Sequence, residues 1–177
     1  DILHRAISKG SYEAEKVSET ISPSMDIQIA SNFERLIFDL NNGDDQQTSL
    51  DMKNIKEKGQ YLINDDKLNK ISENFLSARM SEDETLKIIK NVYEKFTIVL
   101  DPHTAIGYGA FDKHNLKGNN IVLATAHPCK FPRAIQSAIN VKAELPNELT
   151  FILDQKENYH VVENDIEKVK QHIKDRS

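Results

Sequence analysis

The chain has 177 residues, which is the length of one ordinary domain. Hydrophobic residues make up 38% and charged residues 29%, so the chain is too apolar to be disordered throughout. The formal net charge of −5 argues against a general affinity for nucleic acid phosphates. No apolar run approaches the roughly 20 residues needed to cross a bilayer, and no secretory pattern is seen. We therefore expect neither nucleic acid nor membrane partners.

The residue types that usually hold metals or form disulfides are sparse or wrongly spaced. Cys129 is the single cysteine and has no zinc-like Cys/His spacing around it, which favours a cytoplasmic protein. It lies two residues from His127 without a third group to orient the pair, which argues against a nucleophile. The acidic runs 44–45, 65–66 and 82–84 lack the spaced ligands and the glycine of a calcium loop. We expect no metal site, and no glycine-rich phosphate loop is present.

Three helices are expected before residue 80. The first follows a cap at Ser31 or Asn32 and has apolar positions at helical spacing. These positions are Phe33, Leu36, Ile37 and Leu40. Two more polar helices are expected at 50–58 and 65–73, and the alternation of residues 74–80 predicts a short strand.

Three further helices have clear start signals. Ser81 and Glu84 have the spacing of a capping box, in which each side chain satisfies a backbone N–H of the other end. The apolar face of the helix that follows consists of Leu86, Ile89, Val92, Tyr93 and Phe96. Pro132 fits the first turn of another helix, and Asn164 or Asp165 begins a terminal one.

Residues 97–100 and 120–126 predict two buried strands, each followed by a helix. This alternation predicts an α/β fold with a parallel sheet and crossover helices, and the small residues of 105–110 should approach that sheet. The carboxyl ends of parallel strands meet at one edge, where ligands of such folds bind. The polar corners 101–104 and 125–128 should therefore lie at the same rim.

His103, Thr125 and His127 are candidate ligand-facing residues because of this rim position. Each also has a simpler structural interpretation: His103 as a hydrogen bonder at a helix start, or Thr125 as part of a buried strand whose hydroxyl bonds to backbone. The residues by themselves thus predict an α/β domain with a ligand rim and unknown chemistry.

Segments in three regions of the chain resemble signatures of threonine synthases of the bacterial and fungal type. The first region consists of 22–28 (SPSMDIQ) and 31–36 (SNFERL). The second is 100–107 (LDPHTAIG), and the third is 124–132 (ATAHPCKFP). Their order and intervals resemble the family over about residues 1–140. Cys129 departs from the pattern, where the family more often has alanine.

The resemblance implies a pyridoxal phosphate enzyme of the tryptophan-synthase-β fold, fold type II, more than twice as long as this chain. In that family, the lysine that forms a Schiff base with the cofactor and the loop that holds its phosphate lie earlier in the sequence. No lysine here has a matching context, and Lys130 is not the family's Schiff-base lysine. We expect residues 1–177 to be a single incomplete domain, the C-terminal part of a catalytic domain completed by the N-terminal half of the enzyme.

The reaction implied by the resemblance converts O-phospho-L-homoserine and water to L-threonine and phosphate. Thr125 matches the hydroxyl that faces the pyridine nitrogen of the cofactor. The resemblance makes His103, Thr104 and His127 substrate-side candidates. It suggests structural packing near the site for three residues of the first region, Asn32, Glu34 and Arg35.

The chain alone is expected to be inactive because the Schiff-base lysine is missing. Two alternatives stay open. One is a non-catalytic interaction or regulatory protein derived from half of a synthase, and the other is an enzyme of the same fold type with a related substrate.

Overall fold

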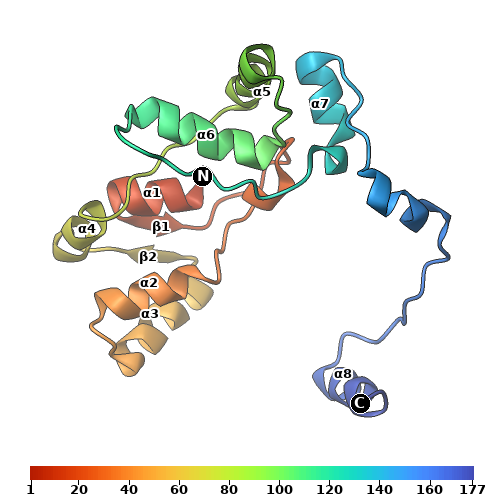
Figure 1. The fold of residues 1–177 in the computed structure, drawn as a ribbon. Coiled ribbons are helices and arrows are strands. Elements are labelled where there is room, and N and C mark those ends of the chain that lie inside the picture. The colour runs from red at the N-terminus through yellow and green to blue at the C-terminus, as the bar shows by residue number, and fades with distance from the viewer. The chain divides into compact units, whose positions relative to one another are not determined.

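The computed structural model describes residues 1–177, which form two compact units, 1–144 and 145–177. Figure 1 shows the elements along the chain. Unit 1 contains seven α-helices, two single turns of 3₁₀ helix and two short strands. In chain order these are α1 (Ile2–Lys9), β1 (Ser11–Glu13), η1 (Pro23–Met25), α2 (Phe33–Leu40), α3 (Asp45–Lys58), β2 (Gln60–Leu62), α4 (Asp65–Ser72), α5 (Glu82–Phe96), α6 (Pro102–His114), η2 (Pro128–Lys130) and α7 (Pro132–Ile139).

The only sheet is the antiparallel pair of β1 and β2, in which Tyr12 lies opposite Tyr61. Gly10 ends α1 at a φ of 71°, and a Cβ there would lie 2.7 Å from the Ile63 carbonyl oxygen. Glycine is therefore required for the close approach of β1 to the residue after β2. The Tyr12 hydroxyl accepts a 2.7 Å hydrogen bond from the Ala30 N–H, which ties the loop before α2 to the sheet.

One hydrophobic cluster packs α1 to α4 around this sheet. The rings of Tyr12 and Phe33 stack with centroids 5.1 Å apart. Its buried members are Ile2, Ala6, Tyr12, Ala30, Phe33, Ile37, Leu40, Ile55, Tyr61, Ile63 and Ile71. Burial of each large side chain contributes about 1.5–3 kcal/mol relative to exposure, so this cluster is what makes such short strands stable.

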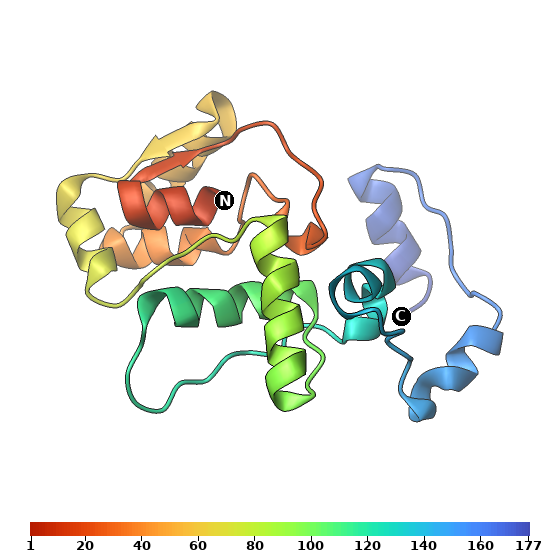
Figure 2. The ribbon, with the colours of Figure 1, turned by 90° about the horizontal axis from the view of Figure 1, so that it is seen from above.

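A second cluster joins α5, α6 and α7 around Ile89, Ala105 and Ile135. Figure 2 shows α5 crossing α6. At Gly109 of α6, an added Cβ would lie 2.5 Å from Ile88 Cδ1 of α5. Gly109 therefore faces a neighbouring helix, whereas a Cβ at Gly107 would lie 3.6 Å from Val122 in the predicted strand 120–126. Residues 1–177 contain no sheet beside α6, so the expected approach to one is not confirmed.

The helices follow the predictions from local capping signals closely. Both reciprocal hydrogen bonds of the capping box form between Ser81 and Glu84 at the start of α5. The helix expected at 50–58 begins earlier, because the Asp44 side chain accepts a 2.9 Å hydrogen bond from the Gln47 N–H and caps α3. Residues 74–80 contain no strand, contrary to expectation.

The predicted strands at 97–100 and 120–126 are not strands within residues 1–177. Their β-branched and apolar composition suits a sheet, but a strand needs a neighbouring backbone to pair with its N–H and C=O groups. No other segment of the chain pairs with them, and Ile121 and Leu123 are 90% and 74% exposed. The chain is mostly helical, and the predicted parallel sheet is not formed by these residues alone.

Unit 2 contains η3 (Asn147–Asp154) and α8 (Ile166–Lys174). Asp165 caps α8, as predicted, by accepting from the Glu167 and Lys168 N–H groups, both at 3.0 Å. No residue of this unit is buried. The apolar side chains of α8, at Ile166, Val169 and Ile173, are exposed.

None of the eight α-helices combines the length and the apolar composition that crossing a membrane requires.

Candidate functional site

The N-terminus of α6 is built on a completely buried carboxylate, that of Asp101. Asp101 is the N-cap of α6, and Pro102 occupies the first helical position, where a missing N–H does no harm. Its Oδ1 accepts from the His103 N–H at 2.9 Å, and its Oδ2 accepts from the Thr104 N–H at 3.4 Å. Because burial of an uncompensated carboxylate costs several kcal/mol, these donors decide whether the charge is tolerated.

The His103 ring is held from both sides. Its Nε2 accepts a 3.1 Å hydrogen bond from the Ser24 N–H, so the ring proton lies on Nδ1 and is donated to Asp101 Oδ1 at 3.0 Å. The ring also packs against Phe131, with centroids 4.8 Å apart. The hydrogen bonds therefore assign one neutral tautomer to His103 and leave neither nitrogen free.

Thr104 connects this carboxylate to the segment before η2. Its hydroxyl donates to Asp101 Oδ2 and accepts a 3.1 Å hydrogen bond from the Thr125 N–H. The result is a continuous chain of hydrogen bonds through Ser24, His103, Asp101, Thr104 and Thr125, which we call the Asp101 network. It joins three segments that are far apart in the sequence.

A cavity of about 640 Å³ opens beside the Asp101 network. The predicted corners 101–104 and 125–128 both contribute to its wall, so the structure brings them together, although no sheet edge does so. Thr104 and His127 line the cavity, whereas His103 and Thr125 do not. The complete lining is Ile98, Val99, Leu100, Asp101, Thr104, Ala124, Ala126, His127, Pro128, Val141, Lys142, Ala143 and Glu144.

His127 and Thr125 each present an unused polar atom. His127 Nδ1 accepts a 3.2 Å hydrogen bond from the Cys129 N–H at the start of η2, which leaves the proton on Nε2 without a protein acceptor. The Thr125 hydroxyl makes no hydrogen bond, and its residue is exposed. Both atoms are available to a ligand.

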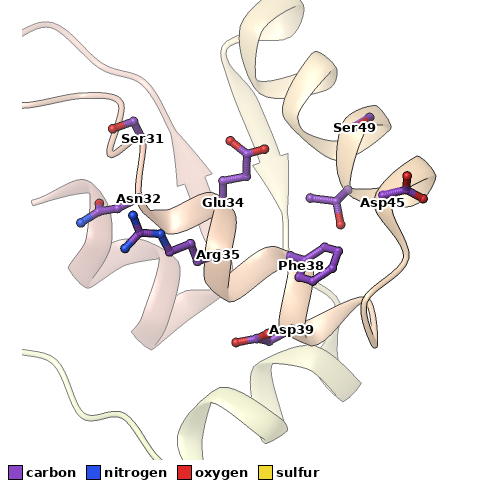
Figure 3. A pocket seen from close by; sticks show the side chains of 9 residues that line it. Ser31, Asn32, Glu34, Arg35, Phe38, Asp39, Asp45 and Ser49 are labelled. Carbon is purple, nitrogen blue, oxygen red and sulfur yellow. The ribbon is translucent and has the colours of Figure 1, made fainter.

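A second and larger cavity, of about 740 Å³, lies against α2 and the first turn of α3. Figure 3 shows its lining side chains, among them Asn32, Glu34 and Arg35. Asn32, Glu34 and Arg35 are exposed, and Phe33 between them packs in the core. Their structural packing near the site stays a prediction. The three acidic residues that line this cavity, Glu34, Asp39 and Asp45, are also exposed. Thr48 is the buried polar residue of the lining, and its hydroxyl already accepts from the Asn41 amide and donates to the Asp44 carbonyl, so no unpaired buried polar group indicates a ligand here.

Sequence reasoning gave no role to Asp101 or Ser24. An Asp followed by Pro is a signal for a helix start, and that signal alone identifies the cap of α6. The bonds to the side chains of His103 and Thr104 have no such signal. No group of three or more His, Cys, Asp or Glu side chains is arranged to hold a metal ion.

Residues 104–173 match the family model described as "Threonine synthase, C-terminal". The chain is 36% identical to the threonine synthase of Pseudomonas aeruginosa over 172 residues, which are 96% of this chain and 37% of the relative. It is also 36% identical to that of Saccharomyces cerevisiae, covering 99% of this chain and 39% of the relative.

Solved structures give the same result. The crystal structure of threonine synthase with bound pyridoxal phosphate from Brucella melitensis matches all of this chain, at a TM-score of 0.85 and 38% identity. The yeast threonine synthase structure matches 98% of the chain, at a TM-score of 0.80 and 35% identity. The chain spans only 38% and 40% of these two proteins.

These relatives and structures are all named threonine synthases, and the family model describes their C-terminal part. The chain belongs to the threonine synthase family.

Proposed function

We propose that the chain supplies part of an enzyme that converts O-phospho-L-homoserine and water to L-threonine and phosphate with pyridoxal phosphate. The observation that carries the proposal is the Asp101 network. It joins Ser24, the three residues Asp101, His103 and Thr104, and Thr125, so each of the three regions that resemble threonine synthases contributes to it. Relatives that are 36% identical across nearly the whole chain are named threonine synthase.

The residues present fit one side of the proposed cofactor. Thr125 offers a hydroxyl with no protein partner, and its backbone is fixed by the hydrogen bond to Thr104. A hydroxyl can pair with the pyridine nitrogen without holding that nitrogen protonated, as a carboxylate would. Bound pyridoxal phosphate would supply an electron sink for negative charge that develops on the substrate carbons.

Of the three substrate-side candidates, Thr104 and His127 line the 640 Å³ cavity. The free Nε2–H of His127 can donate to a substrate oxygen, and Lys142 lines the same cavity. His103 has protein partners on both nitrogens, so in this arrangement its contribution is to hold the loop at Ser24.

The rest of the enzyme would complete the sheet. Residues 97–100 and 120–126 have strand composition without partners, and Ile121 and Leu123 are largely exposed. We infer that strands from the N-terminal half pair with them into the parallel sheet of fold type II, so that residues 1–177 are part of one domain. Without that half, exposed apolar side chains favour self-association.

The test is phosphate release from O-phospho-L-homoserine in the presence of pyridoxal phosphate. This chain is assayed alone and then mixed with the part of P. aeruginosa threonine synthase that it does not match. We expect no turnover by the chain alone, because no lysine in it has the context of the cofactor lysine, and turnover in the mixture. Turnover by the chain alone would contradict the proposed division of labour.

The other outcomes separate the alternatives. Halves that associate without releasing phosphate indicate a related substrate. Halves that do not associate indicate a non-catalytic interaction or regulatory protein. The compartment proposed for the enzyme is the cytoplasm, which suits an unpaired Cys129.

A further inference from the structure

We propose that Asp101 is a positioning residue, which acts through Thr104 to fix where the Thr125 hydroxyl meets the cofactor. This inference rests on the proposed function, because it takes Thr125 as the residue that faces the pyridine nitrogen. It adds a role for two residues that do not themselves touch that nitrogen.

Asp101 determines the direction in which the Thr104 hydroxyl donates its proton. A carboxylate only accepts hydrogen bonds, and each oxygen of Asp101 takes one backbone and one side-chain donor. The Thr104 hydroxyl must therefore point its proton at Asp101. Its lone pair is then directed to the Thr125 N–H, 3.1 Å away.

The position of Thr125 depends on the hydrogen bond from its N–H to the Thr104 hydroxyl. Residues 120–126 have no strand partner within the chain, and the Thr125 N–H is the backbone donor of that segment that bonds to another element. In the complete enzyme, where added strands are proposed to pair with residues 120–126, loss of the Thr104 hydroxyl would still remove the bond that positions the Thr125 N–H and would shift the backbone from which the Thr125 hydroxyl extends. An effect on the cofactor would then follow without any contact to it.

The Asp101 network also extends through His103 to Ser24. Because Asp101 Oδ1 accepts the Nδ1 proton of His103, Nε2 is left to accept from the Ser24 N–H. One carboxylate thus sets the proton positions on both sides of the α6 N-terminus. An asparagine could not do the same, since its amide nitrogen would face a donor of either His103 or Thr104.

A plain helix cap is the competing explanation for Asp101. A cap needs only bonds to backbone N–H groups and is usually partly exposed, as Ser81 of α5 is. Asp101 has no exposed side-chain surface and also binds two side chains. A cap would affect the stability of α6, whereas a positioning residue also affects what Thr125 binds.

The experiment uses a chimaera in which this chain replaces the matching segment of P. aeruginosa threonine synthase. The readouts are the dissociation constant and the absorption maximum of bound pyridoxal phosphate, which need no turnover. The variants are Thr125→Ala, Thr104→Val, Thr104→Ser, Asp101→Asn and the double variant of Thr104→Val with Thr125→Ala. Thr85→Val is the matched control, because Thr85 is a buried threonine whose hydroxyl bonds only to the Ser81 carbonyl.

We expect Thr125→Ala to raise the dissociation constant about 10-fold, the effect of losing one hydrogen bond. Thr104→Val and Asp101→Asn should raise it by a similar factor and shift the absorption maximum in the same direction. Thr104→Ser and Thr85→Val should behave as the parent. Since Thr104 acts through Thr125, the double variant should bind no more weakly than Thr125→Ala alone.

The outcomes distinguish the two proposals. An unchanged Thr125→Ala, or a folded parent chimaera that does not bind the cofactor, contradicts the proposed function. A weakened Thr125→Ala with parent-like Thr104→Val, or fully additive effects in the double variant, overturns the role of Asp101 alone. If Asp101→Asn does not fold, the Thr104 series still decides the question.

Discussion

The Ser24 N–H donates a 3.1 Å hydrogen bond to His103 Nε2, although 79 residues separate the two in the sequence. This bond ties η1 to the N-terminus of α6. It also determines which nitrogen of His103 carries the proton, because the acceptor nitrogen must be bare. A loop and a helix end that form no regular secondary structure together are thereby held in register.

His103→Phe tests that connection. The phenyl ring can still pack against Phe131, but Asp101 loses the ring N–H and the Ser24 N–H loses its acceptor. We expect the free energy of unfolding to fall by about 1–3 kcal/mol, measured by urea denaturation of the chain at low protein concentration. His160→Phe, at an exposed position of unit 2, should change it by less than about 0.5 kcal/mol. Equal effects of the two substitutions would contradict the importance of the bond.

Two glycines of α6 should respond oppositely to alanine. A Cβ at Gly107 would make an ordinary 3.6 Å contact with Val122, so Gly107→Ala should stabilise the helix by up to about 1 kcal/mol. A Cβ at Gly109 would lie 2.5 Å from Ile88 Cδ1 and 2.9 Å from Met80 Sδ. Overpacking of this kind costs about 1–3 kcal/mol, so Gly109→Ala should be the less stable variant in thermal unfolding. The reverse order would show that Ile88 and Met80 move aside freely.

Glu84 should make the stability of the chain depend on pH in the acid range. Hydrogen bonds from Lys113 and from the Ser81 N–H lower the pKa of Glu84 from 4.5 to about 2. Because the folded pKa is depressed, this stabilisation is complete above pH 4.5 and is lost as the pH falls through about 2. The pair is exposed, so high salt should weaken the effect.

The measurement is the urea midpoint of Glu84→Gln and the parent as the pH is lowered. The difference between them should shrink as the pH approaches 2. Asp83→Asn is the control, since Asp83 lies in the same first turn but makes no side-chain hydrogen bond. A difference between Glu84→Gln and the parent that stays constant with pH would argue against the lowered pKa.

Tyr61 should ionise later than an ordinary tyrosine. Burial raises the pKa of Tyr61 above 10.0, an effect that the hydrogen bond from Lys67 partly offsets. Because the folded pKa is raised, the associated stability is present below pH 10.0 and is lost as the pH rises through the folded value. In an ultraviolet titration, Tyr61→Phe should remove a phase that ionises later than an ordinary tyrosine.

The same substitution should also destabilise the chain at neutral pH. The Tyr61 hydroxyl donates to Asp51 at 3.1 Å and accepts from Lys67 at 3.0 Å, so its loss should cost about 1–3 kcal/mol. Tyr159 is exposed, and Tyr159→Phe should change the free energy of unfolding by less than about 0.5 kcal/mol.

Local signals in the sequence predict where most helices begin. Ser81 with Glu84, Pro132 and Asp165 each mark a helix start that the structure confirms. These signals work because a helix closes its hydrogen bonds within four residues and its caps are equally local. The prediction that the polar corners 101–104 and 125–128 lie beside one another is confirmed. The motifs in the sequence also indicated the family to which the chain belongs.

The pairing of the strands and the long-range hydrogen bonds of the Asp101 network could be found only in the folded chain. Tyr12 and Tyr61 pair across strands of three residues, which are too short to show a period of their own. Residues 97–100 and 120–126 have strand composition, but composition cannot supply the neighbouring backbone that a strand requires. Asp101 takes its own hydrogen bonds from His103 and Thr104, two and three residues away. The bonds from the Ser24 N–H to His103 and from the Thr125 N–H to Thr104, and with them the tautomer of His103, form only once α6 has folded against segments distant in the chain. Long-range hydrogen bonds depend on which backbones meet, and no local pattern records that.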